Sequence, residues 1–447
     1  MTRGVLGLGF LVLCACYVPN QVYDPVVAKP PKASPPIPLP ASVVAVVPTP
    51  TGKSGKQRTD HIDPNCDPAQ NACMAFLEFD EMGEMWDPDQ LTRALSLIDK
   101  AKSGPNDPVV VTFTHGWKNN ADDRTGRQNG NVIGFEGVLE YLENTLAGFP
   151  VVGIYIGWRG DLIPPYWPVR RQFSYFNREG AAIRIPGTAM TSAVTQIMTR
   201  THQNRPNARA IIVGHSFGGL VMERALTPAM TNFVLQMGSG EHQTWADLVV
   251  FVNSAAAASE GIQMLDFLKD RHVVYVPDNK DPKDPQAARP LFLSISSLGD
   301  TATRFGLPIG HGPSYLSRKI MGSWRQYDPP YPFGVKSQSS FYLSTTAHMD
   351  ALQSHVIVQD TGGPPCGSLG AVHFSVTLTT GQKYNVCEKP GRLNNTPYWA
   401  MEMPVTIVPD HSGIFNENLI RLLAQFLPTR DEMLNPESHK TLRLMSQ

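Results

Sequence analysis

The stretch IIVGHSFGGLV, residues 211–221, decides the fold class of this 447-residue chain. An apolar run leads into GHSFGG, and further apolar residues follow. A Gly-x-Ser-x-Gly turn between a buried strand and a helix forces the serine into a strained backbone conformation, because its two glycines let neighbouring backbone approach without Cβ clashes. The stretch therefore predicts a strand, a sharp turn and a helix, with the Ser216 hydroxyl standing out from the sheet as a candidate nucleophile. A glycine turn that serves only helix packing is the alternative interpretation.

Outward from this turn, short apolar runs alternate with stretches of helical pattern. Most of the runs are continuous and rich in β-branched residues, which is typical of strands buried on both faces. The expected strands are residues 74–79, 109–116, 151–158, 209–216, 248–255, 291–300 and 404–411, and the expected helices are 88–102, 135–147, 178–200, 218–235 and 260–269. This alternation predicts an α/β fold with a mainly parallel, doubly wound sheet and helices on both faces.

Composition and charge limit the domain count and the class of partner. With 42% hydrophobic and 17% charged residues, the chain can bury a large core. We expect one domain over residues 61–447, with insertions near 160–177 and 304–403. Lys and Arg total 38 against 39 acidic residues, so no broad basic surface for nucleic acid is expected.

The N-terminal residues predict export and anchoring. Arg3 and the apolar run GVLGLGFLVL are typical of a signal peptide over residues 1–15. LCAC, which ends at Cys16, resembles a bacterial lipobox, so we expect an exported cell-envelope lipoprotein held to the membrane by a lipidated Cys16, on the periplasmic side or at the outer membrane. An ordinary cleaved signal peptide is the alternative. Residues 16–60 are rich in proline and predict a disordered tether.

Four cysteines remain once Cys14 and Cys16 are assigned to the signal. An even number in an exported chain indicates disulfides, and four cysteines allow three pairings, among which the sequence does not choose. Our hypothesis is two local bridges, Cys66–Cys73 and Cys366–Cys387, the second of which brackets a hairpin with a Thr-Gly turn. The spacing does not match a zinc site, and no metal is expected. The four cysteines are Cys66, Cys73, Cys366 and Cys387.

Three motifs together resemble the α/β-hydrolase superfamily. They are VVVTFTHGW (109–117), GHSFGG (214–219) and IYIGWRG (154–160). TFTHGWKNNA with IYIGWRG resembles a group of bacterial serine hydrolases within it, and the match covers roughly residues 74–425. The resemblance implies an oxyanion hole formed by the backbone N–H groups of Phe217 and Trp117. It also implies that His115 orders the loop and does not act as the base.

The resemblance further implies a Ser-acid-His triad in that chain order. The base is expected to be His411, which follows the apolar run PVTIV through PD. Asp300, at the end of LFLSISSLGD, suits the acid, which must hold the imidazole from a neighbouring strand end. Asp278 and Asp360, which also follow apolar runs, remain alternatives.

These residues indicate a serine hydrolase that cleaves carboxylic esters through an acyl-enzyme and needs no cofactor. The substrate class stays open between a small-molecule ester and a lipid ester, with lipase or phospholipase action as a variant. A non-catalytic envelope binding protein that keeps the fold is the alternative from another class. The insertion DLIPPYWPVRRQFSYFN (161–177) is rich in aromatic residues and predicts either a pocket wall or packing under a loop. Oligomeric state is open.

Overall fold

The structure is a computed structural model of the chain. It describes residues 66–121, 130–162, 168–205, 207–236, 242–243, 245–275, 289–320, 332–370, 372–392, 396–427 and 443–446. The expected signal peptide 1–15, Cys16 and the tether 16–60 lie outside the described residues, as does Asp278. Within the described ranges, no helix combines the length and apolar character needed to cross a bilayer.

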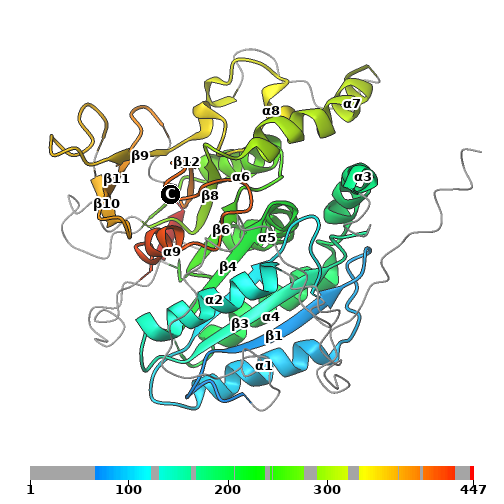
Figure 1. Cartoon of the computed structure of the whole chain (residues 1–447), viewed down its shortest axis with the longest axis vertical. Helices are drawn as coiled ribbons and strands as arrows, with labels where there is room; N and C mark the ends of the chain where they lie inside the picture. Colours follow the sequence, from blue (N-terminus) through cyan, green and yellow to red (C-terminus); the bar gives the residue numbers. More distant parts are fainter. Residues whose placement is uncertain are drawn as a thin grey trace, which may run out of the picture.

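A seven-stranded sheet in the order β1-β3-β2-β4-β6-β8-β12 forms the centre of the molecule (Figure 1). Every neighbouring pair in it runs parallel. Strands β2 and β3 are buried along their whole length, as expected for a sheet covered on both faces. The prediction of an α/β fold with a parallel sheet is confirmed. The strands are β1 (Cys73–Phe79), β2 (Val109–Thr114), β3 (Val151–Trp158), β4 (Arg209–His215), β6 (Leu248–Val252), β8 (Phe292–Ser297) and β12 (Tyr398–Met403).

Helices cover both faces of this sheet, and each face has its own apolar core. The first core contains residues of α1 (Asp89–Lys102), α4 (Thr188–His202), α5 (Phe217–Gln236) and α6 (Ala258–Asp270). The second contains residues of α2 (Gly130–Thr145) and α9 (Glu417–Ala424). Helices α3 (Pro168–Arg184), α7 (Leu307–Ile320) and α8 (Ser340–Leu343) lie towards one edge of the molecule (Figure 1).

Two small antiparallel sheets complete the fold. One joins β9 (His355–Gln359) to the hairpin of β10 (Val372–Thr377) and β11 (Lys383–Glu388). The other joins β5 (His242–Gln243), β7 (Val273–Tyr275) and β13 (Arg443–Ser446). The insertion expected at 304–403 contains α7, α8 and the β10–β11 hairpin, but its last six residues form β12 of the central sheet.

The described cysteines pair locally, in the arrangement of our hypothesis. Cys66 bonds to Cys73 at a Cα–Cα distance of 5.9 Å, and Cys366 bonds to Cys387 at 5.7 Å. The second bridge joins the segment before β10 to β11, so it closes the hairpin that the sequence predicts. Gly381 turns this hairpin with φ +82°, a conformation that glycine adopts without strain.

The expected strand 404–411 is wrong. The last central strand, β12, ends at Met403, and the N–H groups of Ile407 and Val408 both donate to the Pro404 carbonyl oxygen, at 2.9 and 3.0 Å. Pro404 has no N–H to give to a sheet ladder. Ile407 and Val408 are fully buried in the second core, so their apolar character reflects core packing in a turn and not a strand.

The prediction of a single helix over 178–200 is also wrong. The chain forms two helices in this region, because α3 ends at Arg184 and α4 begins at Thr188. Pro186 lacks an N–H and disfavours helical backbone at the residue before it. Gly187 then takes extended backbone and begins α4 as its N-cap residue. This break lets α3 leave the sheet face and extend towards the strand ends where the candidate site lies (Figure 1).

A buried carboxyl on α5 joins this helix to β12. Glu223 is 4% exposed, and the Tyr398 hydroxyl donates to its Oε1 at 3.0 Å. Burial, with a smaller contribution from the nearby Glu260 carboxylate, raises the pKa of Glu223 to about 8. The carboxyl is therefore protonated in the folded protein at neutral pH.

We expect Glu223→Gln to become more stable relative to wild type as pH rises. Between the unfolded pKa of about 4.3 and the folded pKa of about 8, the unfolded state binds fewer protons, so wild-type stability falls with pH by up to about 1.4 kcal/mol per unit. The amide does not titrate and still accepts from Tyr398. Urea unfolding at pH 5 and pH 8 measures the difference. Glu84→Gln, at an exposed residue, is the control. An equal change in unfolding free energy between pH 5 and pH 8 in all three proteins would contradict the expectation.

Candidate active site

Ser216 stands at the turn between β4 and α5 in a left-handed backbone conformation, with φ +56°. Its N–H donates to the Val252 carbonyl oxygen at 3.1 Å, and its own carbonyl accepts the Ala255 N–H at 3.0 Å. Positive φ in a serine is strained and persists only where surrounding structure holds it. The end of the neighbouring strand β6 supplies that hold.

The glycines of GHSFGG are required by close backbone approach. A Cβ on Gly214 would lie 2.7 Å from the Gly218 carbonyl oxygen. One on Gly218 would lie 2.6 Å from the His115 carbonyl oxygen and closer still to that of Thr114. The turn therefore packs against the end of β2 with no room for side chains.

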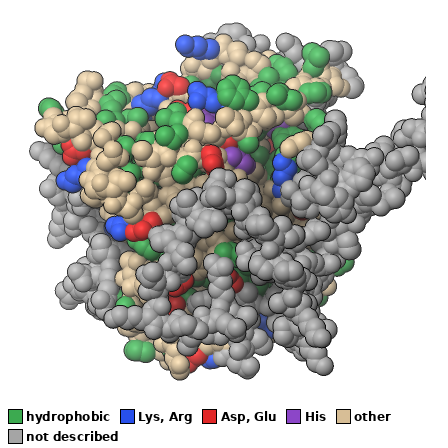
Figure 2. All heavy atoms as spheres, in the orientation of Figure 1, with side chains coloured by type: hydrophobic (Ala, Val, Ile, Leu, Met, Phe, Trp, Pro, Cys, Tyr) green, Lys and Arg blue, Asp and Glu red, His purple; other side chains and the backbone are tan. Residues whose placement is uncertain are grey.

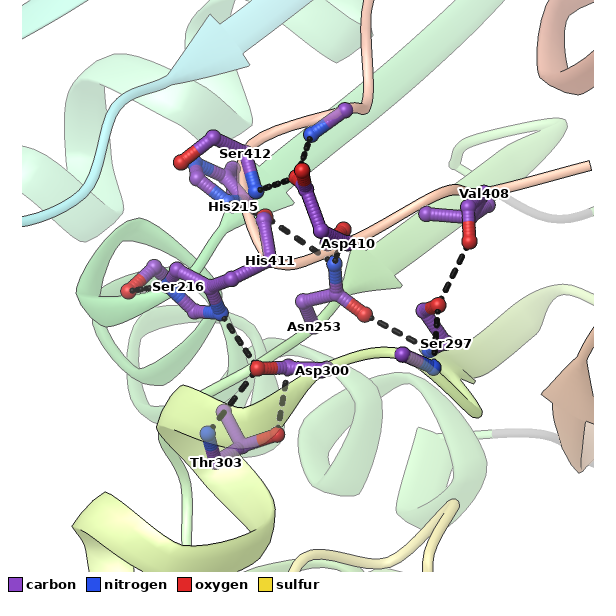
Figure 3. Close-up of polar contacts among 12 residues, drawn as sticks. His215, Ser216, Asn253, Ser297, Asp300, Thr303, Val408, Asp410, His411 and Ser412 are labelled. Atoms are coloured by element: carbon purple, nitrogen blue, oxygen red, sulfur yellow. Dashed lines mark hydrogen bonds and ion pairs between the residues drawn. The ribbon is translucent and has the colours of Figure 1, made fainter. Parts of the chain in front are cut away.

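His411 connects Ser216 to Asp300 (Figure 3). His411 Nε2 lies 2.9 Å from Ser216 Oγ, and His411 Nδ1 lies 2.9 Å from Asp300 Oδ1. Because a carboxylate can only accept, Nδ1 carries the hydrogen and Nε2 is left to accept the serine hydroxyl. The three residues follow β4, β8 and β12, whose carboxyl ends meet at one edge of the parallel sheet.

Asp300 is fully buried, while the His411 side chain is 24% exposed. Burial acts to raise the pKa of Asp300, but hydrogen bonds from His411 and Thr303 outweigh it and hold the pKa below its usual value. Thr303 donates twice, from its N–H to Oδ1 at 3.0 Å and from its hydroxyl to Oδ2 at 2.5 Å. The carboxylate is thus fixed in position and ionised beside the imidazole.

The loop that carries His411 is held by side chains from two other strand ends (Figure 3). The His411 carbonyl oxygen accepts from His215 Nε2 at 2.8 Å and from Asn253 Nδ2 at 3.0 Å. Burial is the main cause that lowers the pKa of His215 to about 3, so this ring is a neutral donor. Asn253 Oδ1 accepts the Ser297 N–H at 2.8 Å, and the Ser297 hydroxyl donates to the Val408 carbonyl at 2.5 Å.

The HGW segment after β2 is fixed to the end of β3 through His115. The Trp158 N–H donates to His115 Nε2 at 3.1 Å, which leaves the hydrogen on Nδ1, 2.9 Å from the Gly116 carbonyl oxygen. The Trp158 indole also donates to the His115 carbonyl at 2.9 Å. Burial lowers the pKa of His115 to about 4, so the ring is neutral. Both ring nitrogens of His115 are therefore engaged, Nδ1 by Gly116 and Nε2 by Trp158.

The start of α5 and the HGW backbone both lie next to Ser216. Phe217 is the first residue of α5, so its N–H has no acceptor within the helix and lies at the positive end of the helix dipole. Gly116 lies directly against the serine, since a Cβ there would be 3.1 Å from Ser216 Oγ. Trp117, the next residue, lines a cavity together with Ser216, Phe217 and His411.

This cavity measures about 410 Å³ and lies between α3 and α7. Most of its lining is apolar and includes Tyr175 and Phe176 of α3 and Leu307 and Ile309 of α7. The volume is in the range of small-molecule sites. The aromatic segment 161–177 therefore contributes a wall in part, while its residues 163–167 lie outside the described residues.

A chain of side chains continues from Asp300 to the surface. Thr303 gives its only hydroxyl hydrogen to Asp300, so at 3.1 Å it must accept from His348 Nε2. His348 Nδ1 lies 2.9 Å from Glu402 Oε1, so Thr303, His348 and the half-buried Glu402 extend the chain of polar contacts beyond Asp300.

The structure brings Ser216, His411 and Asp300 into direct contact, whereas Asp360 follows β9 and accepts the Gly362 N–H. Sequence reasoning missed three supporting residues. Asn253 was expected inside a strand, although asparagine tolerates its φ of +48°. Thr303 had a signal, since an aspartate that accepts the N–H three residues later is a capping pattern. His348 had no signal, because its contacts depend on the folding of a distant segment.

No protein-family model matches the chain, and no curated protein matches it. Among the residues with described positions, no group of three or more His, Cys, Asp or Glu side chains could hold a metal ion.

We expect Gly218→Ala to destabilise the protein by about 1–3 kcal/mol, because its Cβ would overlap backbone that cannot move away. Gly312→Ala in α7 is the control, since its Cβ would meet nothing within 4 Å; it should be neutral or more stable by about 0.5–1 kcal/mol. Chemical denaturation measures both. Equal losses in the two variants would show that close approach is not what requires Gly218.

Proposed function

We propose that this protein is a serine hydrolase that cleaves carboxylic esters through an acyl-enzyme. The observation that carries the proposal is the continuous hydrogen-bonded chain from Ser216 through His411 to Asp300, with both contacts at 2.9 Å. A nucleophile, a base and a group that orients the base are the parts that acyl transfer requires.

In the proposed reaction, Ser216 Oγ attacks the carbonyl carbon of the ester while His411 Nε2 takes its proton. The buried Asp300 carboxylate holds the ring in the tautomer that can accept this proton and stabilises the imidazolium. His411 then gives the proton to the alcohol oxygen, which leaves. Water, deprotonated by the same nitrogen, hydrolyses the acyl-serine and releases the acid.

Backbone N–H groups of Phe217 and Trp117 are the proposed donors to the oxyanion. Support comes from the position of Phe217 at the start of α5 and from the contact of the HGW backbone with Ser216. Donors held before the reaction stabilise developing charge without reorganising. The hydrogen bonds of His115 tie that segment to the end of β3.

The proposed fold type is the α/β hydrolase. Ser216, Asp300 and His411 come in the chain order of that fold, each after a strand of the central sheet. The resemblance of HGW and GHSFGG supports the same assignment. We further propose an envelope location with a lipid anchor on Cys16, which rests on the N-terminal sequence alone.

We expect the wild-type protein to be labelled by a fluorophosphonate probe and Ser216→Ala to remain unlabelled. The probe reacts with a serine only when a base activates it. Leu235→Ser, at a residue that is 53% exposed near the end of α5 far from Ser216, is the control for general damage and should be labelled like the wild type. A folded wild-type protein that takes no label would favour the non-catalytic binding protein.

Thr303→Val should lower kcat/KM for 4-nitrophenyl acetate by about tenfold to a hundredfold, since it removes a hydrogen bond of about 1.5–3 kcal/mol to the Asp300 carboxylate. Thr301→Val, at an exposed residue two positions earlier, is the matched control and should keep its rate. Steady-state kinetics measure both; equal rates in the two variants would exclude Thr303 as a positioning residue.

A further inference from the structure

Helix α7 and the turn before it have apolar side chains on two opposite sides. On the inner side, Leu307 is buried, and Gly310 lies so close to the Tyr175 ring of α3 that a Cβ would overlap it. On the outer side, Phe305, Ile309 and Leu316 are 61%, 73% and 58% exposed. Ile309 and Leu316, seven residues apart, lie on one face of α7, and Phe305 lies in the π-helical turn Ala302–Gly306 directly before it. We refer to these three residues as the outer face of α7.

This outer face is continuous with the candidate active site. Ile309 belongs to the face and also lines the cavity that contains Ser216. Phe176 of α3, which is 52% exposed, lines the same cavity from the other side. Hydrophobic side chains are exposed over the part of the molecule where α7 and α8 lie (Figure 2). An apolar path therefore leads from the outer face to the serine.

The sequence of α7 and of the turn before it contains basic residues and no acidic ones. Residues 301–320 contain Arg304, Arg318 and Lys319 and no Asp or Glu, although the whole chain is balanced at 38 basic and 39 acidic residues. A helix with an exposed apolar face and a net positive charge is typical of one that lies in an anionic membrane interface. Two copies docked through this helix would bring two positively charged segments together, which disfavours self-association.

We propose that the outer face of α7 docks on an anionic lipid surface and that the substrate is a lipid ester taken from that surface. The inference rests on the proposed function of Ser216. The apolar acyl chain occupies the cavity between α3 and α7, with its carbonyl carbon at Ser216 Oγ. The serine oxygen bonds to that carbon, the ester C–O bond breaks, and the alcohol leaves with the proton held by His411. Water then releases the fatty acid.

The test compares full-length proteins that all carry Cys16→Ala, so that no lipid anchor differs between them. The variant is Phe305→Ser/Leu316→Ser, which changes the outer face at two residues that do not line the cavity. The control is Leu235→Ser, which is 53% exposed near the far end of α5 from Ser216. Each protein is sedimented with phosphatidylglycerol or phosphatidylcholine vesicles and assayed on 4-nitrophenyl laurate in the vesicles and on soluble 4-nitrophenyl acetate.

The wild type should bind phosphatidylglycerol vesicles more tightly than phosphatidylcholine vesicles and should hydrolyse laurate in them. The double variant should lose about tenfold or more in vesicle binding and in laurate hydrolysis, because two large apolar side chains no longer enter the lipid. Its rate on acetate should stay at the wild-type value. Leu235→Ser should match wild type in every assay.

Equal vesicle binding by the wild type and the double variant would overturn the docking proposal. So would a wild-type dimer, detected by light scattering, that the double variant dissociates, because the outer face would then be covered by a second copy. Acetate hydrolysis without laurate hydrolysis would overturn the lipid-ester substrate. Vesicle binding without acetate hydrolysis would leave the docking intact and would overturn the proposed function instead.

Discussion

The left-handed backbone of Ser216 is the constraint on which the rest of the site depends. The serine keeps φ +56° only because β4 ends in the middle of a parallel sheet and the end of β6 accepts and donates hydrogen bonds at the turn. The glycines on either side let α5 begin directly against the end of β2. The hydroxyl therefore projects beyond the carboxyl edge of the sheet, beside the amide groups that begin α5.

The parallel sheet then explains how distant segments meet at this serine. Strands β4, β6, β8 and β12 are successive neighbours, so the loops after them are adjacent in space although almost two hundred residues separate Ser216 from His411. Asn253 and His215 both hold the His411 carbonyl, and Thr303 holds Asp300. The turn at Ser216 and the His411 loop are thus held by hydrogen bonds from other strand ends, and Asp300 is held by Thr303 of its own segment. A preorganised site needs support of this kind.

Helices α3 and α7 add what the sheet cannot supply, a walled cavity and an apolar exterior. The break at Pro186 frees α3 from the sheet face, and α7 packs against it at Tyr175. Soluble proteins rarely expose several large apolar side chains in one continuous patch. The outer face of α7 therefore links the proposed chemistry at Ser216 to the proposed location of the chain at a membrane surface.

The sequence by itself determined the alternation of strands and helices, the strained turn at Ser216 and a short set of candidates for its partners. These are local signals, because a run of adjacent apolar residues predicts a strand buried on both faces, and adjacent glycines predict a tight turn. The prediction of a strand at 404–411 was wrong, because apolar residues buried in a turn show the same sequence pattern as a strand. Only the tertiary structure selected Asp300 as the contact of His411 and added Asn253, Thr303 and His348. Those contacts join loops that are far apart in the chain, and their hydrogen bonds exist only once the parallel strands bring the loops to one edge.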